Sequence, residues 1–357
     1  MKDDTKIRLF EMMTEMGHEQ IVFCRDDASG YRGIIAIHST ALGPAVGGTR
    51  FWHYASEEDA IIDALRLSRG MTYKCAAAGM ALGGGKAIIL GDNGTAEREK
   101  LFRAHGRFVE RLGGRYITAE DVGTGPADME YVALETRHVG GLPGRGGGDP
   151  SPWTALGAFR AMQAAARYRW GSDDLRGKRV AIQGCGNVGY NLARELHGAG
   201  AGLIVSDVDP EKIERAVEEL DAATATPESI HAVATDIFAP CALGGIINDE
   251  TIPQLKVEIV CGAANNQLLE PKHGEALEGR GILYAPDYVV NSGGVLSGGG
   301  DLFGWTLEKV RGEVLAIYDT LLAVFEIAKA ERIPTYKAAD RLAERRLQDG
   351  AKHSSEP

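Results

Sequence analysis

The sequence predicts an α/β protein of two domains, the second of which contains a doubly wound parallel sheet. Its 357 residues exceed what one hydrophobic core usually serves. A segment dense in glycine and proline, GLPGRGGGDPSP at 141–152, separates two regions of different pattern. We therefore place a first domain at 1–140 and a second at 141–334, and expect 335–357 to pack back on the first.

The first domain is predicted to mix strands and helices. Apolar runs with period two predict strands at 32–39 and 86–90. Residues 56–70 predict a helix, because Ser56 can serve as its N-cap with Asp59 three positions on. The apolar face of this helix would consist of Ile61, Ala64, Leu65 and Ser68.

The second domain shows short strands alternating with helices, the pattern of a parallel sheet with right-handed crossovers. Its predicted strands are VAIQ, then AGLIVSDVD, and then the runs at 235–240, 257–262 and 281–286. Its predicted helices start near Val188, span 210–220 and span 306–331. The tail from 351 to 357 is expected to be frayed.

Composition narrows the class of protein. Apolar residues at 44% and charged residues at 25% are ordinary globular usage, and no apolar run approaches the roughly 20 residues of a membrane span. The net charge of -11 disfavours nucleic acid as a partner. The start of the chain lacks the pattern of a secretory signal, so we expect a soluble, cytoplasmic protein. Scattered cysteines and histidines indicate neither disulfides nor a metal site.

A glycine-rich motif follows the predicted strand VAIQ. It reads G-x-G-x-x-G and consists of Gly184, Cys185, Gly186, Asn187, Val188 and Gly189. The pattern alone is weak in a chain with 47 glycines, but here it leaves a strand and opens a helix, as a dinucleotide-binding turn requires. The turn would present backbone N–H groups to a pyrophosphate. The alternative is a purely structural turn.

An acidic residue stands where such a turn needs one. Asp207 ends the next predicted strand, 18 residues beyond Gly189, close to the spacing of about 20 for the acid that binds the adenosine ribose. Its carboxylate would repel a 2′-phosphate, and no arginine follows directly, so the sequence predicts NAD as the cofactor. The alternative is an incidental surface aspartate.

Two lysines lie in sparse surroundings in GMTYKCAAAGMALGGGKAII at 70–89. If Lys74 and Lys86 are partly desolvated and close together, the pKa of either is lowered, and one could hold an anionic carboxylate while the other acts as a neutral base. The triplet Gly83–Gly85 would allow close approach of a ligand. The alternative is a pair of solvated loop lysines.

A candidate acid follows the β-like run in GRYITAEDVGT at 114–124. Glu120 and Asp121 precede a glycine, a loop position suited to chemistry. A carboxylate there could exchange protons with a substrate amine. The alternative reading of Asp121 is a turn residue or a helix cap.

The motifs GMTYKCAAAGMALGGGKAII, ITAEDVGT, GCGNVG, DIFAPCALGG, CGAANNQL and YAPDYVVNSGG occur in this order. Together they resemble the amino acid dehydrogenase family that includes leucine, valine, phenylalanine, tryptophan and glutamate dehydrogenases. The likeness covers nearly the whole chain. It implies an N-terminal α/β substrate domain, a Rossmann-type NAD-binding domain, a homo-oligomer, and oxidative deamination of an L-amino acid to a 2-oxo acid and ammonium.

The resemblance also implies roles for single residues. Lys74 would bind the substrate α-carboxylate, Lys86 would be the catalytic base, and Asp121 would carry protons to and from the amino group. Other residues would line the substrate site, namely Val46, Gly47, Gly48, Met71, Asn265, Val295 and Gly298. Beyond the glycine motif and Asp207, the cofactor site would include Thr154, Ala239, Ala263, Asn265 and Asn291.

The resemblance gives a substrate preference as well. Glutamate dehydrogenases carry a lysine in the place of Val46, and without it a buried substrate carboxylate would lack a partner. A hydrophobic, branched-chain substrate is therefore expected. Gly298 stands where a pocket valine is usual, so it would either enlarge the pocket for phenylalanine or tryptophan or merely soften a loop. Two other classes stay open, a hydroxy-acid or malic-type oxidoreductase and a non-enzymatic nucleotide sensor.

Overall fold

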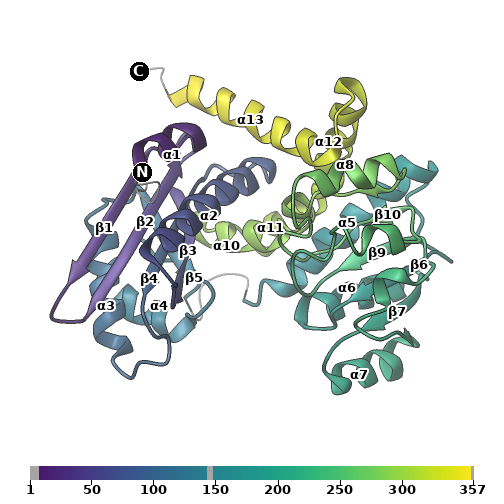
Figure 1. Ribbon diagram of the computed structural model, residues 1–357, viewed down its shortest axis with the longest axis horizontal. Helices are drawn as coiled ribbons and strands as arrows, with labels where there is room; N and C mark the ends of the chain where they lie inside the picture. The colour runs from purple at the N-terminus through teal and green to yellow at the C-terminus, as the bar shows by residue number, and fades with distance from the viewer. Residues whose placement is uncertain (1–7, 143–147, 355–357) are drawn as a thin grey trace, which may run out of the picture. The chain divides into compact units, whose positions relative to one another are not determined.

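The computed structural model describes residues 8–142 and 148–354 (Figure 1). Its contacts define two compact units. The first unit contains 1–148, 301–304 and 344–357, and the second contains 149–300 and 305–343. The first unit thus extends past the boundary expected at 140. Of the segment 335–357 expected to pack back on it, 344–357 belongs to the first unit and 335–343 to the second. Part of the linker expected at 141–152 lies outside the described residues.

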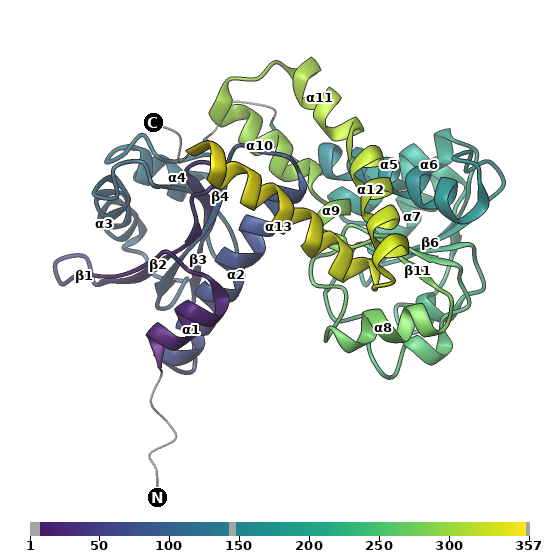
Figure 2. The same ribbon diagram turned by 90° about the horizontal axis from the view of Figure 1, so that it is seen from above.

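The first unit is a five-stranded mixed sheet between helices. The strand order is β1-β2-β4-β3-β5, in which β3 is parallel to both β4 and β5. Figure 2 shows α2 on one face of this sheet and α3 and α4 on the other. The elements are α1 (Leu9–Met16), β1 (Gln20–Asp26), β2 (Tyr31–Ser39), β3 (Ala45–Trp52), α2 (Glu57–Ala77), β4 (Gly83–Leu90), α3 (Arg98–Glu110), β5 (Tyr116–Glu120) and α4 (Pro126–Ala133).

Helix α2 is longer than expected. The predicted N-cap is confirmed, because the Ser56 hydroxyl accepts the Asp59 N–H at 3.1 Å. The helix does not end at residue 70 but at Ala77, since Thr72 and Cys75 continue the buried face. Arg346 donates to the carbonyls of Ala76 and Ala77 and so caps the C-terminal end. Lys74 therefore lies in the last turn of a helix and not in a loop.

The glycine triplet at 83–85 packs against protein atoms. All three glycines are buried in strand β4. A Cβ on Gly84 would come within 2.1 Å of the Thr72 backbone nitrogen, and one on Gly85 within 2.7 Å of the Tyr116 ring. These glycines let helix α2 and the ring approach the sheet, so the expectation that they serve ligand approach is wrong.

The close approach of α2 to the sheet predicts a stability effect. Gly84→Ala is expected to lower the free energy of unfolding by about 1–3 kcal/mol, because a backbone nitrogen cannot yield to the new methyl group. Gly70→Ala is the matched control: Gly70 is an exposed residue inside the same helix with open space around it, and alanine there should stabilise by about 0.5–1 kcal/mol. Urea unfolding of both variants measures the two effects, and a wild-type midpoint for Gly84→Ala would contradict the packing argument.

The second unit is built on a six-stranded parallel sheet, the doubly wound class predicted from the sequence. The order β11-β10-β9-β6-β7-β8 starts centrally and winds outward in both directions, with the chain crossing over between β8 and β9. Its first elements are α5 (Ser151–Trp170), β6 (Arg179–Gln183), α6 (Asn187–Gly198), β7 (Gly202–Ser206), α7 (Pro210–Leu220), β8 (Ala223–Thr224), η1 (Ile230–Ala232) and β9 (Ile237–Pro240). They are followed by η2 (Ile252–Gln254), β10 (Ile259–Val260), α8 (Lys272–Gly279), β11 (Leu283–Tyr284) and α9 (Asp287–Val290).

The C-terminal helices are α10 (Gly293–Phe303), α11 (Leu307–Leu315), α12 (Ile317–Glu331) and α13 (Thr335–Ser354). The single helix expected at 306–331 is two helices that meet at Ala316. The frayed tail expected from residue 351 is wrong as far as Ser354, where α13 still continues. No helix among the described residues is long and apolar enough to cross a membrane.

Candidate active site

The side chains of strand β3 alternate between the two faces of the sheet, and one face contributes to the candidate site. Gly47, Thr49 and Phe51 are buried, while Val46, Gly48 and Arg50 are half-buried on the opposite face. In the parallel pairing Arg50 lies beside Ile88, two residues after Lys86 in β4, and Thr49 lies beside Glu120 at the end of β5. Lys86, Arg50 and Asp121 are therefore presented on one face of the sheet.

Lys86 is a buried cation in contact with a carboxylate. Only 6% of the residue is exposed, and its Nζ donates to Asp121 Oδ2. Burial lowers the pKa of the Lys86 ammonium, and the charge of Arg50 lowers it further, although Asp121 partly opposes both effects. An ammonium buried without a partner is costly. The arrangement thus favours a lysine that loses its proton more readily than an exposed one.

Asp121 is held in place by the turn that follows β5. Its N–H donates to the Thr124 hydroxyl at 2.8 Å, and the Thr124 N–H returns to the Asp121 carbonyl at 3.0 Å. A Cβ on Gly48 would come within 2.7 Å of the Asp121 Cβ, so glycine makes room for this side chain. Burial raises the pKa of Asp121, but Lys86 and Arg50 outweigh it, and the net pKa lies below the ordinary value.

Arg50 is a member of this cluster that was not predicted from the sequence. Its Nε lies 3.3 Å from Asp121 Oδ2, and its Nη1 lies 2.8 Å from Asp63 Oδ2. Arg50 is a cation that lowers the pKa of Lys86, while the effect expected of Lys74 on that pKa stays a prediction. The alternating side chains of β3 could have indicated Arg50 from the sequence, because Val46, Gly48 and Arg50 share one face of the strand.

The other expected substrate residues of the first unit lie on α2 and β3. Met71 and Lys74 are half-buried and stand three residues apart on α2, so they share one side of that helix. Gly47 packs between strands, since a Cβ there would come within 1.8 Å of the Gly85 carbonyl oxygen. Contact of Lys74, Met71, Val46, Gly47 or Gly48 with a substrate stays a prediction.

The first unit thus combines three groups with distinct proton chemistry. A buried lysine can lose its proton, a carboxylate touches it, and a guanidinium that keeps its proton touches the same carboxylate. A general base needs a pKa near the working pH and contact with its proton partner. Lys86 has a lowered pKa and contacts Asp121, a carboxylate with which it can exchange a proton.

The glycine motif of the second unit shows the geometry of a dinucleotide-binding turn. Gly184 has φ +97, which a side chain would strain. A Cβ on Gly189 would come within 1.9 Å of the Gly184 carbonyl oxygen, so this glycine allows the helix to pack on the strand. A Cβ on Gly186 would meet nothing within 4 Å, which leaves the backbone open to a ligand. Helix α6 begins directly afterward at Asn187, and its N-terminal end favours a phosphate.

Asp207 lies at the carboxyl end of β7, as expected. Its carboxylate accepts the N–H of Cys185 at 2.7 Å and the N–H of Asp209 at 3.0 Å. The bond to Cys185 ties the acidic residue to the glycine turn. The donors and acceptors present therefore fit a dinucleotide, whose pyrophosphate the turn would bind and whose ribose Asp207 would bind.

Other expected cofactor residues gather at the carboxyl ends of neighbouring strands. Ala239 lies in β9, and Ala263 and Asn265 follow β10. The Asn291 amide donates to the Ala263 carbonyl at 3.1 Å and to Asn265 Oδ1 at 2.8 Å, so these three residues form one group. Thr154 lies in the first turn of α5, where its hydroxyl donates to the Pro150 carbonyl, and it packs against Gly293 and Gly294, shortly after Asn291 in the chain.

Val295 and Gly298 belong to helix α10. The suggestion that Gly298 softens a loop is therefore wrong, because this position is helical. The two residues are three apart and share one side of the helix. A Cβ on Gly298 would meet nothing within 4 Å, so the position offers open space.

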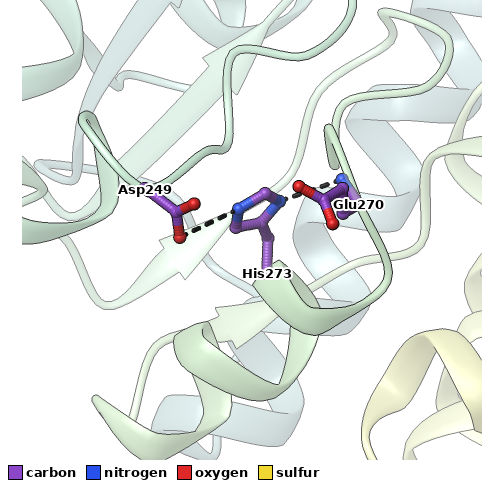
Figure 3. A group of neighbouring side chains, drawn as sticks. All are labelled: Asp249, Glu270 and His273. Carbon is purple, nitrogen blue, oxygen red and sulfur yellow. Dashed lines mark hydrogen bonds and ion pairs between the residues drawn. The ribbon is translucent and has the colours of Figure 1, made fainter.

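A separate polar cluster needs no metal ion to explain it. His273 stands at the start of α8 between Asp249 and Glu270 (Figure 3). Its Nδ1 accepts the Glu270 N–H at 2.9 Å, which leaves Nε2 to carry the proton toward Asp249, 3.2 Å away. The Lys272 ammonium lies 2.8 Å from Asp249 and 3.3 Å from Glu270. The protein's own cation thus balances both carboxylates, and we assign no metal to this group.

Fold and site together define a dehydrogenase that uses a pyridine nucleotide. The profile of the Glu/Leu/Phe/Val dehydrogenase dimerisation domain matches residues 18–138, and the Glutamate/Leucine/Phenylalanine/Valine dehydrogenase profile matches 146–210 and 205–354. The chain belongs to the Glu/Leu/Phe/Val dehydrogenase family. This confirms the resemblance seen in the sequence motifs and establishes the chain as an amino acid dehydrogenase, an NAD(P)-dependent oxidoreductase.

Individual relatives cover nearly the whole chain. Leucine dehydrogenase from Geobacillus stearothermophilus is 55% identical over 96% of this chain and 94% of its own. Valine dehydrogenase from Streptomyces virginiae is 50% identical over 93% of this chain and 94% of its own. The crystal structure of L-tryptophan dehydrogenase from Nostoc punctiforme superimposes with a TM-score of 0.89 at 49% identity, covering 96% of this chain and all of that one.

Proposed function

We propose that this protein catalyses the NAD-dependent, reversible oxidative deamination of a hydrophobic, branched-chain L-amino acid to its 2-oxo acid and ammonium. The observation that carries the proposal is the buried Lys86 in contact with Asp121, with the aliphatic Val46 paired to Gly84 two residues before Lys86, in a chain of this family. The balanced reaction consumes one water and NAD⁺ and releases NADH and one proton.

The chain's own groups supply binding and proton transfer. The Lys74 ammonium holds the substrate α-carboxylate, and Asp121 accepts a proton from the substrate ammonium group. NAD⁺ held at the glycine turn and Asp207 would supply the acceptor for the hydride that leaves the substrate Cα. Neutral Lys86 then takes a proton from the water that adds to this carbon. The resulting Lys86 ammonium can then donate a hydrogen bond to the hydroxyl oxygen of the neutral carbinolamine.

NAD is the proposed cofactor rather than NADP. The Asp207 carboxylate stands beside the nucleotide turn through its bond to Cys185. A carboxylate here accepts hydrogen bonds from the ribose hydroxyls and repels a 2′-phosphate. Val208, Asp209 and Pro210 follow it, and none of them can neutralise that phosphate.

The aliphatic side chain of Val46 supports a hydrophobic substrate. Val46→Lys is expected to lower kcat/KM for leucine by about 100-fold or more, because the new ammonium would meet an apolar side chain without a partner. Val46→Met, of similar length but uncharged, is the control and should lose less than about 10-fold. Steady-state kinetics with leucine measure both. Wild-type rates in Val46→Lys would remove Val46 from the substrate site.

An aromatic amino acid is the second candidate substrate. The open space around Gly298 favours it, since a larger side chain would find room there if this position lines the pocket. One methylene in a hydrophobic pocket is worth about 1–3 kcal/mol. Comparing kcat/KM for leucine, valine and phenylalanine therefore decides which substrate the enzyme prefers.

The test is a panel of 2-oxo acids with ammonium and either NADH or NADPH. We expect fastest oxidation of NADH with 4-methyl-2-oxopentanoate, slower oxidation with phenylpyruvate, and little with 2-oxoglutarate or with NADPH. Oxidation of NADH that does not need ammonium would indicate a hydroxy-acid dehydrogenase. Binding of NADH without turnover of any 2-oxo acid would indicate a nucleotide sensor. Either result overturns the proposal.

A homo-oligomer is part of the proposal. The profile that matches 18–138 describes a dimerisation domain. Strand β1 is an edge of the first sheet, and Phe23 on it is 55% exposed. An open edge strand with an exposed aromatic side chain favours pairing with a second copy of the chain.

A further inference from the structure

We propose that Arg50 is a positioning residue for the Lys86–Asp121 pair: its guanidinium, anchored by Asp63, holds the Asp121 carboxylate and supplies a positive charge that persists when Lys86 gives up its proton. This inference rests on the proposed function, in which Lys86 acts as the base. It gives a role to an ion pair that the mechanism above does not use.

The geometry is a chain of contacts across three elements. Arg50 in β3 uses Nε toward Asp121, at 3.3 Å, and Nη1 toward Asp63 in α2, at 2.8 Å. The Tyr54 hydroxyl donates to the same Asp63 oxygen at 2.5 Å. The side chains of Arg50, Asp63 and Asp121 are each about one-quarter exposed, so solvent screens this network only in part. The guanidinium is thereby held at both ends.

The need for such a group follows from the proton cycle. Lys86 and Asp121 stabilise each other only while Lys86 is an ammonium. When Lys86 is neutral, the half-buried Asp121 loses that partner and burial favours its protonated form. Arg50 keeps its charge at every working pH. It therefore stabilises both an ionised Asp121 and a neutral Lys86, the state in which the pair can accept protons.

The pKa directions agree with this geometry. Arg50 lowers the pKa of Lys86 and also that of Asp121. Asp63 raises the pKa of Lys86, but the positive charge of Arg50, which forms an ion pair with Asp63, offsets part of that increase. The pKa of Arg50 itself stays above its ordinary value, because Asp121 and Asp63 outweigh burial.

A cavity beside this network supplies a matched control. The cavity has a volume of about 500 Å³ and is lined by Arg50 and Asp63 together with Trp52, Asp59 and Arg66. Arg66 is exposed, and no ion pair joins it to another of the described residues. Replacing Arg66 therefore changes the charge of the same cavity without touching Asp121.

The test compares charge-removing and charge-keeping variants of the full-length protein. Arg50→Gln and Arg50→Met remove the charge, Arg50→Lys keeps it, and Arg66→Met is the control. In the two neutral variants we expect kcat to fall about 100-fold with KM changed less than about threefold, a loss of the order expected for one preorganised charge. The rising limb of kcat/KM against pH should move to higher pH, because Lys86 then holds its proton more tightly.

The charge-keeping and control variants separate positioning from folding. Arg50→Lys should keep the rising limb near its wild-type position, and Arg66→Met should change kcat less than about twofold. If Arg50→Met does not fold, the comparison of Arg50→Gln with Arg50→Lys decides. A wild-type rising limb in the folded neutral variants would overturn the inference.

A second readout does not depend on turnover. The titration of Lys86, followed by NMR of ¹³Cε-labelled lysine, should move to higher pH in Arg50→Gln and stay in place in Arg66→Met. An inactive wild-type enzyme would overturn the proposed function but leave this shift measurable. An unmoved Lys86 titration in Arg50→Gln would refute the role of Arg50 even if the enzyme is an active dehydrogenase.

Discussion

Lys86→Ala is expected to lower kcat for oxidative deamination by about 10⁴-fold or more while NADH binding persists. The variant removes both the base that takes a proton from water and the cation that stabilises the resulting oxygen, effects worth about 10²–10⁴-fold and 10²–10³-fold in other enzymes. The nucleotide turn lies in the second unit and keeps its geometry. Steady-state kinetics and fluorescence titration with NADH measure the two effects.

Two features of the first unit show whether a loss of activity in Lys86→Ala comes from the missing base and not from misfolding. Asp121 retains Arg50 as a partner in Lys86→Ala, so the remaining carboxylate is not left uncompensated. Lys100→Ala removes an exposed lysine that pairs with Glu97 on the surface and should change kcat less than about twofold. Appreciable turnover by a folded Lys86→Ala protein would show that another group is the base.

Asp121→Asn is expected to lower kcat by about 10²–10³-fold and to move the rising limb of kcat/KM to lower pH. The amide keeps the shape but can no longer accept a proton from the substrate ammonium group. Burial lowers the pKa of Lys86 while Asp121 raises it, so removal of the carboxylate lowers that pKa further. The pH dependence of kcat/KM measures the shift, which is opposite in sign to that expected for Arg50→Gln.

The neighbouring carboxylate is the control for this variant. Glu120→Gln makes the same chemical change one residue earlier. Glu120 is exposed at the end of β5, and its side chain lies on the opposite face of the sheet from that of Asp121. It should leave both kcat and the rising limb close to those of the wild type. A shift to higher pH in Asp121→Asn would contradict the account of how the Lys86 pKa is set.

The features predicted correctly from the sequence depend on local patterns. The G-x-G-x-x-G turn, the N-cap at Ser56 and the helix at 210–220 each lie within a few consecutive residues, and the backbone geometry follows from them. The long family motifs identified the family in the same way. These signals do not depend on which distant segments meet.

The features that the sequence did not predict depend on tertiary contacts. The Gly83–Gly85 triplet was assigned to ligand approach, but its neighbours are Thr72 on α2 and Tyr116 on β5. Arg50 meets Asp121 across 71 positions of the chain, a pairing that no local pattern encodes. The length of α2 was underestimated because small residues such as Cys75 and Ala76 give a weak apolar signal, although both are buried.

The central claim is that burial makes Lys86 a better proton donor than an ordinary lysine, and NMR tests it directly. Protein labelled with ¹³Cε-lysine is titrated with pH, and the Lys86 resonance is assigned by its absence in Lys86→Arg. We expect Lys86 to titrate below 10.5, the ordinary value for a lysine, and below the exposed lysines of the same sample. A Lys86 resonance that titrates together with the exposed lysines, or above them, would contradict the account.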